Sequence, residues 1–254
     1  MRIAPRTATH PLLLAALGLL LAATSAAAQN TAVIAGGPHD LSGGSAVRNT
    51  NTSIDGQTCV FCHTPHGGST SIPLWNRANT TATYQLYTSS TSDVTTTNGA
   101  VTAGGTGACM SCHDGTMAMD VLLNVNGLPF GPAASFTVQG TAKATYGNTS
   151  PGSNNRMTGG LPFLGTDLRN DHPVAIVYET ARNATPSEFV TQITSGAKIT
   201  VGTTPNPALP LFGASAGTAT VECASCHNAH NNSLGNFLRA SNAGSAMCKS
   251  CHIK

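Results

Sequence analysis

Residues 223–252 read CASCHNAHNNSLGNFLRASNAGSAMCKSCH, and this stretch contains the same five-residue pattern twice. The pattern is Cys-x-x-Cys-His, and it occurs twice more nearer the N-terminus. We number the four copies units 1 to 4: Cys59, Cys62 and His63; Cys109, Cys112 and His113; Cys223, Cys226 and His227; Cys248, Cys251 and His252. All eight cysteines of the chain lie in these units, so the sequence is organised around four copies of one motif.

The spacing within each unit predicts covalent attachment of haem. Two thiols three residues apart can bond to the two vinyl groups of one haem, and the adjacent histidine then reaches the iron from one side. Eight cysteines could instead form disulfides, zinc sites or redox dithiols. None of these alternatives requires a histidine directly after the second cysteine, and all four units have one. We therefore expect four c-type haems.

Histidines outside the units predict how the irons are coordinated. His10 lies in a predicted leader, which leaves four spare histidines: His39, His66, His172 and His230. One spare histidine for each iron gives six-coordinate haems with no position open to a substrate. This favours an electron carrier over an enzyme. The alternative is a multihaem reductase, which needs at least one five-coordinate iron.

His66 and His230 each follow the histidine of units 1 and 3 by three residues. Three residues span at most about 10 Å, too little to pass round a haem and reach the same iron from its other face. Each must therefore serve a different haem. From the repeated order of the units, we expect His66 to bind the iron of unit 2 and His230 that of unit 4. His172 would then serve unit 1 or unit 3.

Residues 1–28 have the pattern of a secretory signal peptide. Arg2 and Arg6 form a basic start, Leu12 to Ala23 is an apolar run, and Ala26-x-Ala28 is a small-residue cleavage site. The run is too short to span a bilayer, and no later segment is apolar enough to do so. We expect an extracellular or cell-surface protein, with the periplasm as the alternative. Residues 29–254 are predicted to form one tetrahaem domain, with a unit pair at 59–113, an intervening segment at 114–222 and a unit pair at 223–252.

Composition limits the fold and the partners. Charged residues make up 9% of the chain, against about a quarter in typical proteins, and without Arg2 and Arg6 ten basic residues face ten acidic ones. This balance gives no reason to expect nucleic acid as a partner. Aromatic residues are only 5%, so the side-chain core should be small and folding should depend on the haems. We expect a multihaem cytochrome c fold, mostly irregular coil with few short helices and strands around a chain of haems.

A few segments carry clearer local signals. Gly, Ser, Thr and Asn predict an extended arm at 29–58, which carries His39, and loop with short strand at 80–106. Alternation predicts short strands at 136–139 and 198–201. Thr185, Pro186 and Glu188 have the pattern of a helix start, with an N-cap, a proline at the first position and a capping-box glutamate. Pro173 should hold His172 in extended backbone.

The two unit pairs form an internal repeat. Cys59 to His66, followed by Leu74-Trp75 and Arg77, matches Cys223 to His230, followed by Phe237-Leu238-Arg239. Arg77 and Arg239 are each predicted either to meet a haem propionate or to be solvated surface charges.

These motifs resemble those of secreted multihaem c-type cytochromes, nearest to the extracellular filament-forming tetrahaem type (OmcE-like). The resemblance rests on four stretches, at residues 38–42, 59–66, 73–77 and 112–116, together with the doubled motif at 223–252. It implies little regular structure, a continuous haem chain, head-to-tail polymerisation, and redox proteins or extracellular acceptors as partners. It further implies that His39 ligates a haem of a neighbouring subunit. A purely intramolecular His39, in a soluble periplasmic shuttle, is the alternative.

Overall fold

The computed structural model of the chain describes residues 34, 37–41, 58–69, 72–119, 121–125, 128–129 and 156–253. The predicted signal peptide, most of the predicted arm and the predicted strand at 136–139 lie outside these residues. Within them, no helix is both long enough and apolar enough to cross a membrane.

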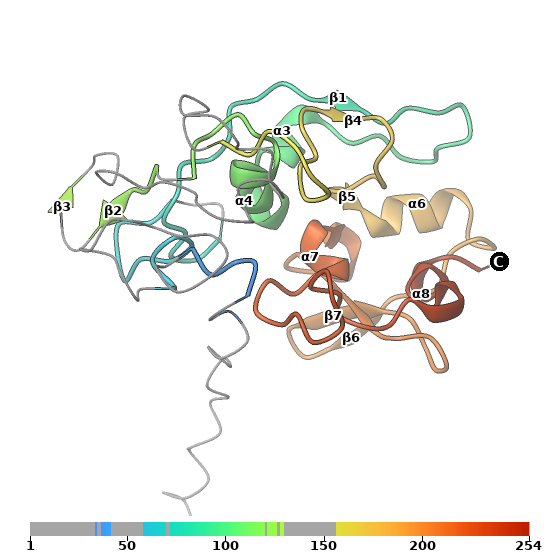
Figure 1. Cartoon of the computed structure of the whole chain (residues 1–254). Helices are drawn as coiled ribbons and strands as arrows, with labels where there is room; N and C mark the ends of the chain where they lie inside the picture. The colour runs from blue at the N-terminus through green and yellow to red at the C-terminus, as the bar shows by residue number, and fades with distance from the viewer. Residues whose placement is uncertain are drawn as a thin grey trace, which may run out of the picture.

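Regular structure in the described residues is short and lies between irregular segments (Figure 1). The helices are α3 (Asn98–Val101), α4 (Gly104–His113), α6 (Tyr178–Ala184), α7 (Cys223–Cys226) and α8 (Cys248–Cys251), with 3-10 turns η1 (Ala216–Thr218) and η2 (Ala243–Ser245). The strands are β1 (Gln85–Leu86), β2 (Asn124–Val125), β3 (Leu128–Pro129), β4 (Asp167–Leu168), β5 (Ile176–Val177), β6 (Ile193–Ser195), β7 (Lys198–Val201), β8 (Leu209–Leu211) and β9 (Thr220–Val221). This confirms the expectation of few short elements in a mostly irregular chain.

Among the described residues, the largest sheet is antiparallel, in the order β6-β7-β8, and its central strand β7 confirms the strand predicted at 198–201. Ile199 and Val201 alternate along β7, so both point to the same face. They pair with Leu211 and Leu209 of β8, and all four side chains are buried. Tyr178 of α6 and other residues join them in one apolar cluster. This cluster is the core beside units 3 and 4.

A second, smaller core lies beside unit 2. It gathers Tyr84, Val101, Met110, Leu168 and Ala175. Two-stranded ladders complete the fold: β1 pairs with β4 in parallel, while β2 pairs with β3 and β5 with β9 antiparallel. The cores are small, as the low aromatic content predicts.

Helix α4 and unit 2 both end at His113, and Gly115 allows the backbone to leave the helix there. Gly115 has φ of +70°, and a Cβ at this position would collide with the carbonyl oxygen of Met157. A side chain there would therefore be strained in its backbone and would collide with a neighbouring segment. The amide of Leu164 donates to the carbonyl of His113 at 2.9 Å, which holds the returning chain against unit 2.

The helix predicted to begin after Thr185 is not present. Thr185 instead closes α6, and residues 186–188 form a turn in which the amide of Glu188 donates to the carbonyl of Thr185 at 3.0 Å. Phe189 then forms a bridge with His252, and the amide of Val190 donates to the carbonyl of Cys251 at 2.9 Å. Pairing with unit 4 outweighs the local helix signal because it satisfies the same backbone groups within the packed structure.

The internal repeat is confirmed by the backbone hydrogen bonds that follow units 1 and 3. After unit 1, the amide of Thr64 donates to the carbonyl of Leu74 at 2.8 Å. After unit 3, the amide of Asn228 donates to the carbonyl of Phe237 at 2.7 Å. Leu74 and Phe237 share positive φ angles of 62° and 55°. The two loops therefore close in the same way.

The predicted match of Leu74-Trp75 with Phe237-Leu238 is confirmed, but the match of Arg77 with Arg239 is wrong by one residue. The amide of Asn76 donates to Cys62, and that of Arg239 donates to Cys226, both at 2.9 Å. Asn76 Nδ2 donates to the carbonyl of Val60 at 2.7 Å, and Arg239 Nε donates to that of Ala224 at 2.6 Å. Asn76, rather than Arg77, therefore occupies the place of Arg239, because the first loop is one residue longer.

Candidate haem-attachment site

Each unit forms a single helical turn. The amide of the unit histidine donates to the carbonyl of the first cysteine at 2.8 Å in unit 1, 3.0 Å in unit 3 and 2.9 Å in unit 4, and unit 2 is the last turn of α4. Residues three apart on a helical turn lie on the same side, so both thiols of a unit can meet one planar group. All eight cysteines are free thiols. The local geometry therefore fits a haem held by two thioether bonds.

A buried serine precedes the second cysteine in units 2, 3 and 4. Ser111 Oγ donates to the carbonyl of Ala108 at 2.7 Å, and Ser250 Oγ donates to that of Pro207 at 2.6 Å. Ser225 Oγ accepts from the amide of Glu222 at 3.0 Å. The Ser250 bond fixes unit 4 to a distant segment, whereas the Ser111 and Ser225 bonds stabilise their own helical turns. The recurrence of Cys-x-Ser-Cys-His was visible in the sequence, but its structural role was not predicted.

The thiols of successive units are neighbours. Burial and then the nearby thiol of Cys112 raise the pKa of Cys62 to about 12, so the thiols of units 1 and 2 lie within electrostatic range of each other. A thiol hydrogen bond between Cys109 and Cys223 raises the pKa of Cys109 and links units 2 and 3. Burial and then Cys226 raise the pKa of Cys251 to about 12, which links units 3 and 4. The attachment points thus follow one another in space in their order along the chain.

Three spare histidines lie opposite three unit histidines. The ring centroids are 6.0 Å apart for His63 and His230, 6.2 Å for His39 and His113, and 6.4 Å for His172 and His252. With metal–nitrogen bonds of about 2 Å, two imidazoles on opposite sides of one metal ion have centroids about 6.3 Å apart. The separations therefore fit two axial ligands on one iron in three of the four units.

Backbone carbonyls fix the tautomer of several of these rings. A carbonyl oxygen lies 2.7 Å from Nδ1 of His113, 2.8 Å from that of His172 and 2.8 Å from that of His227. Since a carbonyl only accepts, Nδ1 must carry the hydrogen and donate it. Nε2 then keeps the lone pair that binds a metal. These histidines are thus held in the tautomer that an iron ligand needs.

His39 is held by the loop that follows unit 3. Its ring stacks on Phe237, with centroids 4.1 Å apart and planes inclined by 11°, and its Nδ1 lies 3.4 Å from the carbonyl of Ala229. Burial, His113 and then other histidines lower the pKa of His39 to about 4. The ring is therefore neutral at pH 7, as a ligand must be. Sequence reasoning missed Phe237 and Ala229 because nothing local links them to position 39.

The pairing of histidines differs from the one predicted within each repeat. His230 lies opposite the unit 1 histidine rather than that of unit 4. The unit 2 histidine faces His39 rather than His66, and His172 faces unit 4 rather than unit 1 or 3. Chain reach excludes ligation of a histidine's own haem, but it does not select the partner. His66 is exposed and faces no other histidine ring in the described part of the chain.

Arg77 takes neither of its predicted roles, because it is 1% exposed and surrounded by oxygen acceptors. Its Nε donates to Ser111 Oγ at 3.2 Å, its Nη1 to the carbonyl of Met119 at 2.8 Å, and its Nη2 to the carbonyls of Ser111 and Ala118 at 3.1 and 2.8 Å. Four of its five N–H groups are thus used within the protein. Arg77 holds the segment after unit 2 against unit 2 itself. Arg239 is exposed, and its role toward a propionate stays a prediction.

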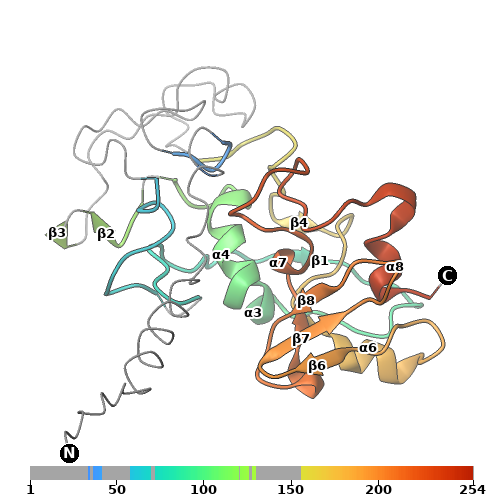
Figure 2. The same ribbon diagram turned by 90° about the horizontal axis from the view of Figure 1, so that it is seen from below.

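Two buried carboxylates support the units. Asp114 accepts from Thr80 Oγ1 and from the Tyr84 hydroxyl, both at 2.7 Å. Glu222 accepts from the amide of Thr106 at 3.0 Å, from the hydroxyl of the same threonine, and from Thr220 Oγ1 at 2.6 Å. Because Thr106 belongs to α4 and Glu222 precedes α7, this second cluster joins the helices of units 2 and 3, which lie side by side in Figures 1 and 2.

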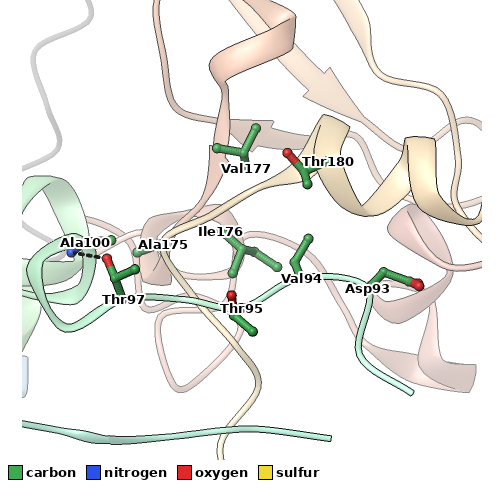
Figure 3. Close-up of a pocket in the computed structure, with 9 residues that line it drawn as sticks. All are labelled: Asp93, Val94, Thr95, Thr97, Ala100, Ala175, Ile176, Val177 and Thr180. Carbon is green, nitrogen blue, oxygen red and sulfur yellow. Dashed lines mark hydrogen bonds between the residues drawn. The ribbon is translucent and has the colours of Figure 1, made fainter. Parts of the chain in front are cut away.

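A hollow of about 310 Å³ lies away from the units, between residues 93–100 and the start of α6 (Figure 3). Its lining is apolar and hydroxyl side chains plus Asp93, whose carboxylate accepts from Thr185 Oγ1 at 2.7 Å. None of the predicted site residues lines it. The chemistry of the described chain is therefore concentrated in the motif turns and their histidines.

Residues 216–254 match the family model of the doubled CXXCH motif. This part of the chain contains units 3 and 4 and is similar to c-type cytochromes that carry such motifs in pairs. The match supports haem c binding and electron transfer by a c-type cytochrome-like multihaem protein. No curated protein matches the chain.

Proposed function

We propose that this chain is an electron carrier with four c-type haems, each held by two cysteines and two histidines. The observation that carries the proposal is that the rings of three spare histidines lie opposite those of three unit histidines. Their ring centroids are 6.0–6.4 Å apart. Intact-mass measurement of the mature protein tests the haem count. Four covalently bound haems are expected, and two or three would contradict the proposal.

The chain's own residues would hold the cofactors in a defined way. The eight thiols would attach them, and His63, His113, His227 and His252 would supply the first iron ligand. His230, His39 and His172 would supply the second ligand for units 1, 2 and 4. Haem iron supplies one-electron chemistry when bound, alternating between ferric and ferrous states. Backbone carbonyls at Nδ1 orient the rings and raise their basicity, which adjusts the potential.

Two histidines for each haem would leave no iron position open to a substrate, which argues against the reductase alternative. An enzyme that reduces a small molecule at haem needs an iron with one free position. With two histidines for each haem, we expect the oxidised protein to be entirely low-spin by electron paramagnetic resonance, and the reduced protein not to bind carbon monoxide. A high-spin fraction of about one haem in four, together with carbon monoxide binding, would favour the reductase.

The order of the thiols supports electron transfer along the molecule. Units 1 and 2, 2 and 3, and 3 and 4 have neighbouring cysteines. Haems attached at these points would form a continuous row, over which electrons move by short steps. Redox proteins or extracellular acceptors would then meet the row at its ends, and the protein itself would make and break no substrate bonds.

We further propose that the protein is secreted and that it polymerises into extracellular filaments. This rests on the leader-like sequence at 1–28 and on the resemblance of the motifs. Electron microscopy of the native secreted material tests it directly. Filaments with one repeat per subunit are expected, whereas monodisperse particles in the periplasmic fraction would contradict it.

One observation favours the soluble shuttle as a second candidate. His39, the residue expected to reach a neighbouring subunit, lies against Phe237 and opposite His113 of its own chain. In this arrangement the second histidine ligand of the unit 2 haem comes from the same subunit. No neighbouring subunit is needed to supply it. Dilution separates the two candidates: a shuttle keeps all haems low-spin at nanomolar concentration, while a filament linked through His39 loses one ligand as it dissociates.

A further inference from the structure

Two histidines remain without a counterpart after the three ring pairs are assigned. All eight histidines after His10 lie among the described residues, and six of them form the pairs. The remaining two are His227, the unit histidine of unit 3, and His66, the spare histidine that follows unit 1. Unit 3 therefore lacks a second ligand, and His66 is the one spare histidine without an assigned haem.

The repeat supplies a geometric reason to join them. The loops after units 1 and 3 close through equivalent hydrogen bonds, so His63 corresponds to His227 and His66 to His230. The structure pairs His63 of the first loop with His230 of the second. The same exchange in the opposite direction joins His66 of the first loop to His227 of the second. The equivalence of the loops thus supplies a candidate for the fourth pair from the first.

The reach and chemistry of both residues agree with this. His66 follows His63 by three residues and His230 follows His227 by three, so each lies within about 10 Å of backbone from the observed pair. A carbonyl at 2.8 Å holds the hydrogen on Nδ1 of His227, which leaves Nε2 for a metal. The carbonyl of His66 accepts from Thr64 Oγ1 at 2.9 Å and from Asn124 Nδ2 at 3.3 Å, which anchors its backbone while the side chain is exposed.

We propose that His66 is the second axial ligand of the unit 3 haem, so that the two repeats exchange ligands reciprocally. Units 1 and 3 each take a histidine from the other repeat. Units 2 and 4 take theirs from outside the repeated loops, at His39 and His172. The proposal rests on the four-haem function above and adds the one ligand that the ring pairs do not assign.

The experiment uses the full holoprotein with His66→Met. In the reduced, diamagnetic state, a methionine methyl bound to haem iron has a strongly upfield-shifted proton resonance. We expect this methyl to show nuclear Overhauser contacts to the haem whose thioether protons belong to Cys223 and Cys226. His230→Met is the matched control, and its methyl should contact the haem of Cys59 and Cys62. Contacts from position 66 to the haem of Cys109 and Cys112 would overturn the proposal.

His66→Ala keeps the test decisive if methionine does not bind. One of four low-spin signals in the oxidised protein should be replaced by a high-spin signal, with the haem count unchanged. Four low-spin haems in His66→Ala would overturn the proposal while leaving the four-haem function intact. A high-spin haem in the unmodified protein would instead count against the proposed function itself, so the two failures are distinct.

Discussion

The N-terminal unit pair at 59–113 and the C-terminal pair at 223–252 close their loops alike but are anchored differently. In the N-terminal pair, the fully buried Asn76 and Arg77 fasten the loop, and unit 2 ends a ten-residue helix. In the C-terminal pair, units 3 and 4 are four-residue turns, and Arg239 at the equivalent position is exposed. The backbone closure that presents the histidines is thus common to both, while the means of stabilising it differs between the copies.

The largest expected effect comes from removing the buried guanidinium. Arg77→Leu leaves three carbonyls and a serine hydroxyl without their donor, so we expect a loss of about 3 kcal/mol in unfolding free energy. The matched Arg239→Leu removes one hydrogen bond at an exposed position and should lose no more than about 1 kcal/mol. Denaturant unfolding of both holoproteins measures the difference. Equal losses would show that the two loops are anchored with similar strength.

The next largest effect is expected at the hydrogen bonds between Thr106 and Glu222, which join the N-terminal and C-terminal unit pairs. Thr106→Val removes a hydroxyl that donates to Glu222, and we expect a loss of about 2 kcal/mol because the acceptor is a buried carboxylate. Thr220→Val removes another donor to the same carboxylate but lies wholly on the C-terminal side. Hydrogen exchange distinguishes them. Amides of α4 should exchange faster in Thr106→Val than in Thr220→Val, and identical exchange would argue against a link between units 2 and 3.

The smallest effect tests the shared positive φ angle. Leu74 is 51% exposed at φ of 62°, so Leu74→Gly relieves backbone strain and loses little packing. We expect the unfolding free energy to change by less than about 1 kcal/mol. Phe237→Gly relieves the same strain but removes the ring stacked on His39, and it should also alter the low-spin signal of one haem. If neither variant alters that signal, Phe237 does not position His39.

Sequence reasoning found the attachment turns because they are local. Two cysteines three positions apart and an adjacent histidine describe one helical turn, which needs no knowledge of the rest of the chain. The strand at 198–201 was predicted for the same reason, since its alternation reflects the two faces of the sheet. The prediction of a helix after Thr185 was wrong because backbone groups of Glu188 to Val190 pair with residues 251–253, which lie far along the sequence.

Ligand partners were beyond the reach of sequence because they depend on how distant loops meet. The short distance from His63 to His66 excludes the unit 1 haem as the partner of His66 but leaves the other three possible. Nothing in the sequence around His230 indicates that it faces unit 1. The one-residue error in matching Arg77 with Arg239 has a similar origin. Residue types suggested the match, whereas the hydrogen bonds to the carbonyls of Val60 and Ala224 identify Asn76 as the equivalent residue.

The pair formed by His63 and His230 has a consequence for folding kinetics. Its members stand near opposite ends of the described chain, so this contact closes one of the longest loops in the molecule. Loop-closure entropy grows only logarithmically with length, by about 0.6 kcal/mol for each doubling, so the final stability suffers little. The folding rate responds more strongly, because contacts between distant residues slow it. During synthesis the first unit is complete long before position 230 exists, so its second ligand is available only after most of the chain has been made.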